Sequence, residues 1–160
     1  MFLRRNQSDT RNRLGAVAVE FAFVAPMLLA VVVAMLELTR VYDVQNLLEI
    51  SAREGARFAA IDRTGILKEG ESANSKMIQD VTNFMASSGI PSENVQVNIL
   101  DAESPSQTFD LDDPANDLRL FVVEVSVPLS AVSYTPVSEA NDYGMTGRIT
   151  FRNGRAALSQ

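Results

Sequence analysis

The stretch that decides the fold is Ala16–Leu36, AVAVEFAFVAPMLLAVVVAML, in which Glu20 is the only ionisable residue. As an α-helix rising about 1.5 Å per residue, it is about 31 Å long, close to the ~30 Å hydrocarbon thickness of a bilayer. We therefore predict that this stretch spans a membrane. A cleaved secretory signal is the alternative, but the apolar region of such a signal is only about 7–15 residues long. Glu20 also interrupts the present stretch near its start.

The charges on either side of this stretch predict its orientation. Residues 1–13 contain four arginines and one aspartate, whereas the whole chain has a formal net charge of -6. By the positive-inside rule, residues 1–13 lie in the cytoplasm and residues 37–160 on the other side of the membrane. The acidic body also excludes a nucleic-acid-binding role, because a duplex binder needs a basic face to neutralise phosphates.

Two residue types that carry much of enzyme chemistry, cysteine and histidine, are absent from the chain. Their absence excludes Cys/His zinc sites, cysteine nucleophiles and catalytic triads with an imidazole base. Most hydrolase chemistry is excluded with them. We expect a protein that is not an enzyme, with no catalytic residues and no cofactor.

The helical pattern continues beyond the apolar stretch, because apolar residues recur every three or four positions as far as Ile61. We predict one helix from about Leu14 to Ile61. Its outer half carries a stripe of small residues, namely Ala52, Gly55, Ala56 and Ala59. Such a stripe lets another element approach the helix backbone closely, although alanine is also frequent in helices simply because it is the best helix former.

The rest of the chain predicts a small α+β head. An apolar face at helical spacing predicts a second, short helix over residues 74–87. Alternating or β-branched residues predict three strands, over 94–100, 118–127 and 148–151, in a small antiparallel sheet. Residues 101–117 are rich in Ser, Pro and Asp and lack periodicity, so we predict an exposed loop there.

Glu20 needs a physical explanation, because a carboxylate within the hydrocarbon costs roughly 2.5–3.5 kcal/mol. If the chain were cut between Gly15 and Ala16, the new α-amine of Ala16 would lie on the same helical face as Glu20 and could compensate its charge. A neighbouring copy could supply the same amine. The alternative is a Glu20 close enough to the membrane surface to be hydrated or protonated.

A family resemblance supports the first explanation. The segment Arg13–Ala22, RLGAVAVEFA, resembles the processing site of type IV pilin-like proteins, in which a prepilin peptidase cuts after a glycine and glutamate is the fifth mature residue. The segments Val19–Pro26, VEFAFVAP, and Ser51–Ala60, SAREGARFAA, are similar to the TadE-like family of minor pseudopilins of the tight-adherence pilus. The resemblance covers about Leu14–Ile61 and implies a pilin-like form of the α+β fold.

The resemblance implies roles for particular residues. Gly15 would precede the scissile bond and Ala16 would be the mature N-terminus. Glu20 would be the carboxylate used in assembly, with Phe21 beside it. Pro26 matches a proline of the family, and because it removes the amide that would bond to a carbonyl one turn earlier, we expect a helix kink there.

The resemblance also implies the organisation and partners of the chain. Residues 1–15 would be a cleaved cytoplasmic leader, 16–36 the transmembrane half of the helix, 37–61 its extracytoplasmic continuation and 62–160 the head. The protein would lie in the bacterial inner membrane with its head periplasmic or extracellular, and could enter a pilus. The implied partners are the prepilin peptidase, the major pilin, other pseudopilins, the inner-membrane assembly platform and membrane lipid.

The acidic loop offers a different interpretation. Carboxylates from one short loop can hold Ca²⁺, and the weak candidate ligands here are Asp110, Asp112, Asp113 and Asp117. The loop lacks the Asp and Gly order of an EF-hand, so we expect a solvated loop and no metal. The alternative function is a single-pass, membrane-anchored extracytoplasmic domain that binds a ligand through this loop and has no pilus role.

Overall fold

The computed structural model of the chain describes residues 8–61, 67–68, 70–136 and 142–154. The first seven residues of the predicted leader lie outside the described residues. The chain forms two compact units, Met1–Thr39 and Arg40–Gln160, which we call the N-terminal and C-terminal units.

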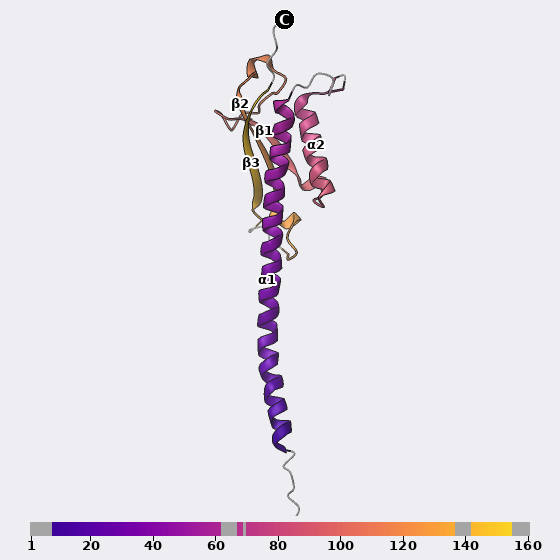
Figure 1. Ribbon diagram of the computed structural model, residues 1–160, viewed down its shortest axis with the longest axis vertical. Coiled ribbons are helices and arrows are strands. Elements are labelled where there is room, and N and C mark those ends of the chain that lie inside the picture. The colour runs from indigo at the N-terminus through magenta and orange to yellow at the C-terminus, as the bar shows by residue number, and fades with distance from the viewer. Residues whose placement is uncertain (1–7, 62–66, 69, 137–141, 155–160) are drawn as a thin grey trace, which may run out of the picture. The chain divides into compact units, whose positions relative to one another are not determined.

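The first helix, α1, spans Ser8–Ala60 and contributes residues to both units (Figure 1). It begins earlier than the predicted start at Leu14, because residues 8–14 contain neither proline nor glycine and nothing in them breaks a helix. It ends at Ala60, next to the predicted end. The assignment remains helical on both sides of Pro26.

The C-terminal unit contains a three-stranded antiparallel sheet in the order β1-β2-β3. The strands are β1 (Gln96–Asp101), β2 (Leu120–Pro128) and β3 (Gly144–Arg152). With the second helix, α2 (Ala73–Ser87), they complete an α+β fold, which confirms the predicted fold class. In Figure 1 the last part of α1 lies between α2 and β3.

One hydrophobic core joins these elements. Every second side chain of β2 points into it, because side chains alternate between the two faces of a strand, and Phe121, Val123, Val125 and Val127 are all buried. Helix α1 and helix α2 each add an apolar stripe at helical spacing. The buried members of these two stripes are Val44, Leu48, Ala52, Ala56 and Ala59 from α1, and Ala73, Met77, Val81 and Met85 from α2.

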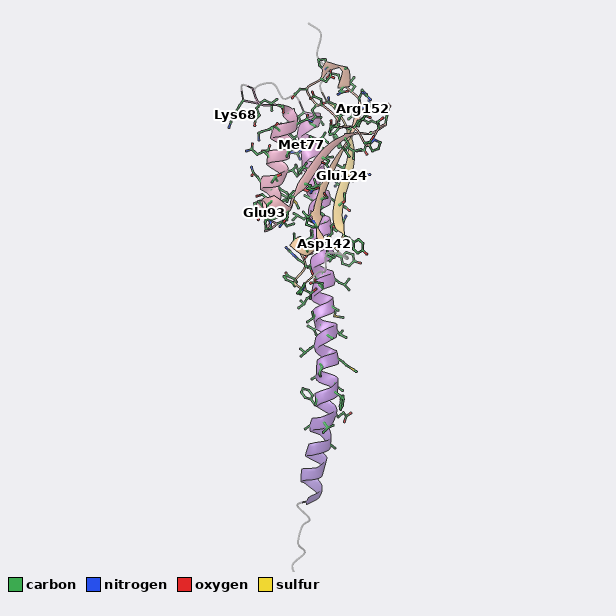
Figure 2. All side chains as sticks on the ribbon, turned by 180° about the vertical axis from the view of Figure 1, so that it is seen from behind. Lys68, Met77, Glu93, Glu124, Asp142 and Arg152 are labelled. Atoms are coloured by element: carbon green, nitrogen blue, oxygen red, sulfur yellow. The ribbon has the colours of Figure 1, made fainter. Side chains whose placement is uncertain are left out.

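The opposite face of the sheet carries a polar ladder centred on Glu124 (Figure 2). Its Oε1 accepts a hydrogen bond from Asn98 Nδ2 on β1 at 3.4 Å, and its Oε2 accepts one from Arg148 Nε on β3 at 2.9 Å. The hydrogen bond from Arg148 is the main cause that lowers the pKa of Glu124, against the smaller effect of burial. These hydrogen bonds therefore link one side chain from each of the three strands.

The segment between β1 and β2 differs from the prediction of an exposed loop. Phe109 and Leu111 are only 1% and 0% exposed. The ring of Phe109 stacks on Phe121 of β2, with 5.5 Å between the ring centroids and 26° between the ring planes. The prediction is wrong for these two residues, because isolated apolar side chains in a polar segment show no periodicity and yet still bury themselves in a core.

Two buried or half-buried asparagines fix this segment to the rest of the unit. At the start of α2, Asn74 Nδ2 donates to the Phe109 carbonyl at 2.7 Å, and Asn74 Oδ1 accepts from the Leu111 amide at 2.9 Å. After the end of β3, Asn153 Nδ2 donates to the Leu111 carbonyl at 3.2 Å. The buried part of the segment thus has its backbone polar groups paired, as burial requires.

Candidate membrane and assembly segment

The first part of α1 is apolar on all sides and exposed. Within Gly15–Ala60, an 18-residue window reaches a mean hydropathy of 2.5, and none of that window is buried. A helix that is hydrophobic all round is stable only when lipid or other protein surrounds it. By length and composition this helix can cross a membrane. The exposed large apolar residues are Val17, Val19, Phe21, Phe23, Val24, Met27, Leu28, Leu29, Val31, Val32, Val33, Met35 and Leu36.

The predicted scissile bond, between Gly15 and Ala16, lies within the helical backbone of α1. A Cβ atom added to Gly15 would meet no atom within 4 Å. Packing in this structure therefore does not explain why this position is glycine. A requirement for glycine at position 15 has to come from the conformational freedom of the backbone or from a molecule that acts on this bond.

Glu20 lies one helical turn after Ala16, and both residues are exposed. Four residues of α-helix correspond to about 6 Å along the axis, and helical side chains lean toward the N-terminus, so the carboxylate extends toward Ala16. Within the described part of the chain, no ion pair engages Glu20. Phe21, beside it, is 69% exposed. The geometry allows a positive charge at Ala16 to reach this carboxylate.

Pro26 lies inside the helix. Its nitrogen carries no hydrogen, so the carbonyl of Ala22 cannot receive the usual helical hydrogen bond from this position. The predicted kink at Pro26 stays a prediction.

The small-residue stripe of α1 lies in the core of the C-terminal unit, where Ala52, Ala56 and Ala59 are fully buried. Gly55 faces α2, and a Cβ added to it would lie 2.8 Å from Val81 Cγ2. The structure therefore brings these four residues together on the side of α1 that contacts α2 and the rest of the core. Small side chains here allow the helices to approach closely.

A groove of about 380 Å³ runs along this contact and has a mainly apolar lining. Its polar side chains are already engaged: Ser51 Oγ donates to the Leu48 carbonyl at 2.8 Å, and Asp80 forms an ion pair with Lys76. Nothing in the groove is arranged as a nucleophile with a base. The residues that line it are Ser51, Glu54, Gly55, Phe58, Met77, Asp80, Val81 and Phe84.

Three carboxylates of the acidic loop accept hydrogen bonds from its own backbone or from α2. Asp110 Oδ1 accepts from the Asp112 amide and Asp113 Oδ1 from the Ala115 amide, each at 2.9 Å. Asp112 Oδ2 accepts from the Ala73 amide at the start of α2, at 2.7 Å. Among the described residues, no three acidic side chains are grouped to hold a metal ion, so the structure does not bring the four calcium candidates together, namely Asp110, Asp112, Asp113 and Asp117.

Asp101, at the end of β1, is a structural carboxylate that the sequence pattern does not reveal. It is 7% exposed, and its Oδ1 accepts from the amides of Glu103 and Ser104 at 2.8 and 3.2 Å. Its Oδ2 accepts from Arg119 Nη2 at 2.8 Å. The amide of Glu103 is the main cause that lowers the pKa of Asp101. Burial opposes it, and Ser104 and Arg119 add to the lowering.

Asp101→Asn is therefore expected to destabilise the C-terminal unit at neutral pH. Because the folded-state pKa of Asp101 lies below its ordinary value of 3.8, its charge stabilises the fold above that value, and the stabilisation is lost as the pH falls through the folded pKa. Denaturant unfolding of the full chain in detergent, followed by near-ultraviolet circular dichroism, should show a wild-type advantage that begins to decline below about pH 3.8 and is lost at the lower folded-state pKa. Glu103→Gln, at an exposed partner of Arg119, should change little, and an equal loss there would contradict this role for Asp101.

An apolar helix long enough to span a membrane, continuous in sequence with a helix that packs on a small antiparallel sheet, is the arrangement that the pilin-like resemblance implies. In a comparison with known families, residues 15–57 match the model of the TadE-like protein family. The resemblance predicted from the sequence is thereby confirmed over this segment, which includes the Gly15–Ala16 bond, Glu20 and Pro26. No curated protein and no solved structure gives a match.

Over residues 15–57 the chain is thus similar to the TadE-like proteins. Its first helix is long and apolar enough to anchor a chain in a membrane.

Proposed function

We propose that the chain is a minor pilin, or pseudopilin, that takes part in assembling a tight-adherence pilus after a prepilin peptidase cuts it between Gly15 and Ala16. The observation that carries this proposal is the fully exposed apolar part of α1 with Glu20 one turn after Ala16. Such a helix can lie in lipid before assembly and against the helices of other subunits afterwards. The match to the TadE-like family over residues 15–57 supports the same function.

The proposed organisation follows from charge and hydropathy. Residues 1–15 form a cytoplasmic leader that is removed, and residues 16–36 form the transmembrane half of α1. Residues 37–61 continue the helix outside the bacterial inner membrane, and residues 62–160 form the periplasmic or extracellular head. The arginines of the leader support this orientation, because basic residues are retained in the cytoplasm. Its partners are the peptidase, the major pilin, other pseudopilins and the inner-membrane assembly platform.

The helical backbone at the cleavage site gives glycine a physical role. A peptidase needs an extended backbone, so the helix around Gly15 has to unwind before the bond is cut. Glycine lowers the helical stability by about 1 kcal/mol relative to alanine and leaves the backbone free to adopt other conformations. This role agrees with the open surroundings of Gly15.

Gly15→Val is expected to leave a full-length product, because the added side chain restricts the backbone and fills space beside the scissile bond. N-terminal sequencing of the protein recovered from membranes should find Ala16 first in the wild type and no such product in the variant. Ala18→Val is the matched control, since it adds bulk at an exposed position of the same helix, and it should be processed normally.

The same sequencing separates the other functions. A membrane-anchored binding domain would keep its leader, and a secreted domain would begin well beyond Ala16 and leave the membrane fraction. Recovery of a mature-size product from Gly15→Val would contradict cleavage at this bond.

A further inference from the structure

The three tyrosines of the chain lie at one end of the C-terminal unit. Tyr42, Tyr134 and Tyr143 are 69%, 72% and 70% exposed. The ring of Tyr134 lies 5.9 Å from the guanidinium carbon of Arg40, near the start of the unit's part of α1. Tyr42 is two residues after Arg40 on the same helix.

Tyr143 is placed at the same end by the packing of β3 along α1. Gln45 Nε2 of α1 donates to the Thr146 carbonyl of β3 at 3.1 Å. From this hydrogen bond, Tyr143 lies three residues back along the strand, or about 10 Å, and Arg40 lies five residues back along the helix, or about 7.5 Å. Tyr143 therefore lies level with Arg40 or slightly beyond it. Figure 2 agrees, because Asp142 is labelled at one end of the unit while Arg152 and Lys68 are labelled at the other.

Hydrogen bonds hold the segments that carry the tyrosines together. A short 3₁₀ turn, Leu129–Ala131, follows β2, and the Leu129 amide donates to the Tyr143 carbonyl at 3.0 Å. Within this turn, Ser130 donates from its amide and its hydroxyl to Asp142, at 2.8 and 2.6 Å. Arg40 Nε donates to the Val132 carbonyl at 3.3 Å. The three rings are therefore presented on a structured end of the unit.

Three exposed tyrosines and one arginine at this end of the unit form an amphipathic belt, in which Tyr134 lies against Arg40 and Tyr42 lies on another side of the helix, because residues two apart on a helix do not face each other. A tyrosine has an apolar ring and a polar hydroxyl, and such side chains are enriched where hydrocarbon meets water. An arginine can extend its guanidinium toward lipid phosphates while its stem covers apolar surface. In the sequence, the exposed apolar residues of α1 continue to Leu36 and Leu38, directly before Arg40.

We propose that Arg40, Tyr42, Tyr134 and Tyr143, which we call the tyrosine seat, bind the headgroup region of the bilayer that the first part of α1 spans. This inference rests on the membrane anchoring in the proposed function. The exposed acidic residues Asp43 and Asp142 lie at the same end and disfavour anionic lipid, so the ligand is a zwitterionic phospholipid surface. The seat would hold the C-terminal unit on the membrane before assembly.

The chain contains no tryptophan, so each tyrosine can be replaced by a single fluorescent reporter. The full-length protein is reconstituted in phosphatidylcholine vesicles that carry bromine on the acyl chains near the headgroups. Tyr134→Trp and Tyr143→Trp are the decisive variants, because they are far from α1 in sequence and report the seat itself. We expect their emission to be quenched relative to the same variants in unbrominated phosphatidylcholine vesicles. In either kind of vesicle, the emission should lie at shorter wavelength than that of a water-exposed tryptophan.

The matched control is Leu120→Trp, at an exposed position at the opposite end of the same sheet, which pairs with Arg152. Its emission should not be quenched. Phe23→Trp, in the apolar part of α1, tests the anchoring separately with bromine placed deep in the acyl chains.

Each outcome supports or overturns the tyrosine seat, the membrane anchoring or both. Quenching of Phe23→Trp together with both tyrosine variants, but not Leu120→Trp, supports the tyrosine seat. Quenching of Phe23→Trp without the tyrosine variants overturns the seat and leaves membrane anchoring intact. Equal quenching of Leu120→Trp overturns the seat too, because contact would not be specific to this end. Absence of quenching at Phe23→Trp overturns membrane anchoring and the seat together.

Discussion

Gly147→Val is expected to unfold the C-terminal unit or to destabilise it by about 3 kcal/mol or more, at the upper end of what overpacking costs. Gly147 lies on β3 where the strand crosses α1, and a Cβ there would lie 2.4 Å from the backbone carbonyl carbon of Leu48 and 2.7 Å from the Glu49 nitrogen. Both atoms belong to a helix backbone, so they cannot move aside as a side chain can. Valine favours strands intrinsically, so the loss cannot come from strand propensity.

The matched control for this substitution is Gly144→Val, at the first residue of the same strand. A Cβ there meets no atom within 4 Å, so the variant should unfold at nearly the wild-type denaturant concentration. Denaturant unfolding and resistance to limited proteolysis measure both variants in the full chain. If Gly147→Val and Gly144→Val were equally stable, the close approach of β3 to α1 would be contradicted.

Most elements of this fold could be predicted from the sequence because their apolar residues repeat. The long run Ala16–Leu36 and the stripe that follows it predict α1, and the alternation within β1 and β2 predicts paired strands. The β3 strand was predicted only over residues 148–151, yet it extends over Gly144–Arg152. Pairing with β2 lengthens it, because backbone hydrogen bonds to a long neighbour do not depend on side-chain type.

Other features depend on contacts between distant residues and leave no local pattern. Phe109 and Leu111 bury themselves from a segment whose composition predicts an exposed loop. The glycine at position 147 is required by a helix that passes it, about one hundred residues away in the sequence. A sequence shows that a glycine is present, but not which backbone approaches it.

The functional residues also differ in whether a local sequence pattern reveals them. Glu20 could be identified from the sequence because one carboxylate in an otherwise apolar run is energetically exceptional. Asp101 and Arg119 form their ion pair across a turn of the chain, and neither stands in an unusual local context. Tyr134 reaches Arg40, and the Tyr143 carbonyl accepts from the Leu129 amide, only after separate segments of the chain have folded together.

Glu20→Gln is expected to leave processing intact and to abolish incorporation into the pilus or its assembly complex. In the proposed function, the carboxylate compensates the α-amine of Ala16 that cleavage creates, within one helix or between subunits. A neutral amide removes the cost of the buried carboxylate but leaves that amine uncompensated in an apolar environment. Removing one partner of a buried ion pair typically costs about 3–5 kcal/mol, which corresponds to more than a hundredfold weaker contact.

The opposite result is expected if the chain is only a membrane-anchored binding domain. Removing a lone carboxylate from a spanning helix then favours insertion, so Glu20→Gln would be neutral or slightly stabilising. Glu49→Gln is the matched control, because it makes the same change at an exposed position of α1 outside the apolar run, and it should assemble normally under both hypotheses. The measurement is piliation and co-purification with partner pilins, at matched abundance of the mature protein in the membrane. Normal assembly of Glu20→Gln would contradict the pairing with Ala16 and, with it, the role of this carboxylate in assembly.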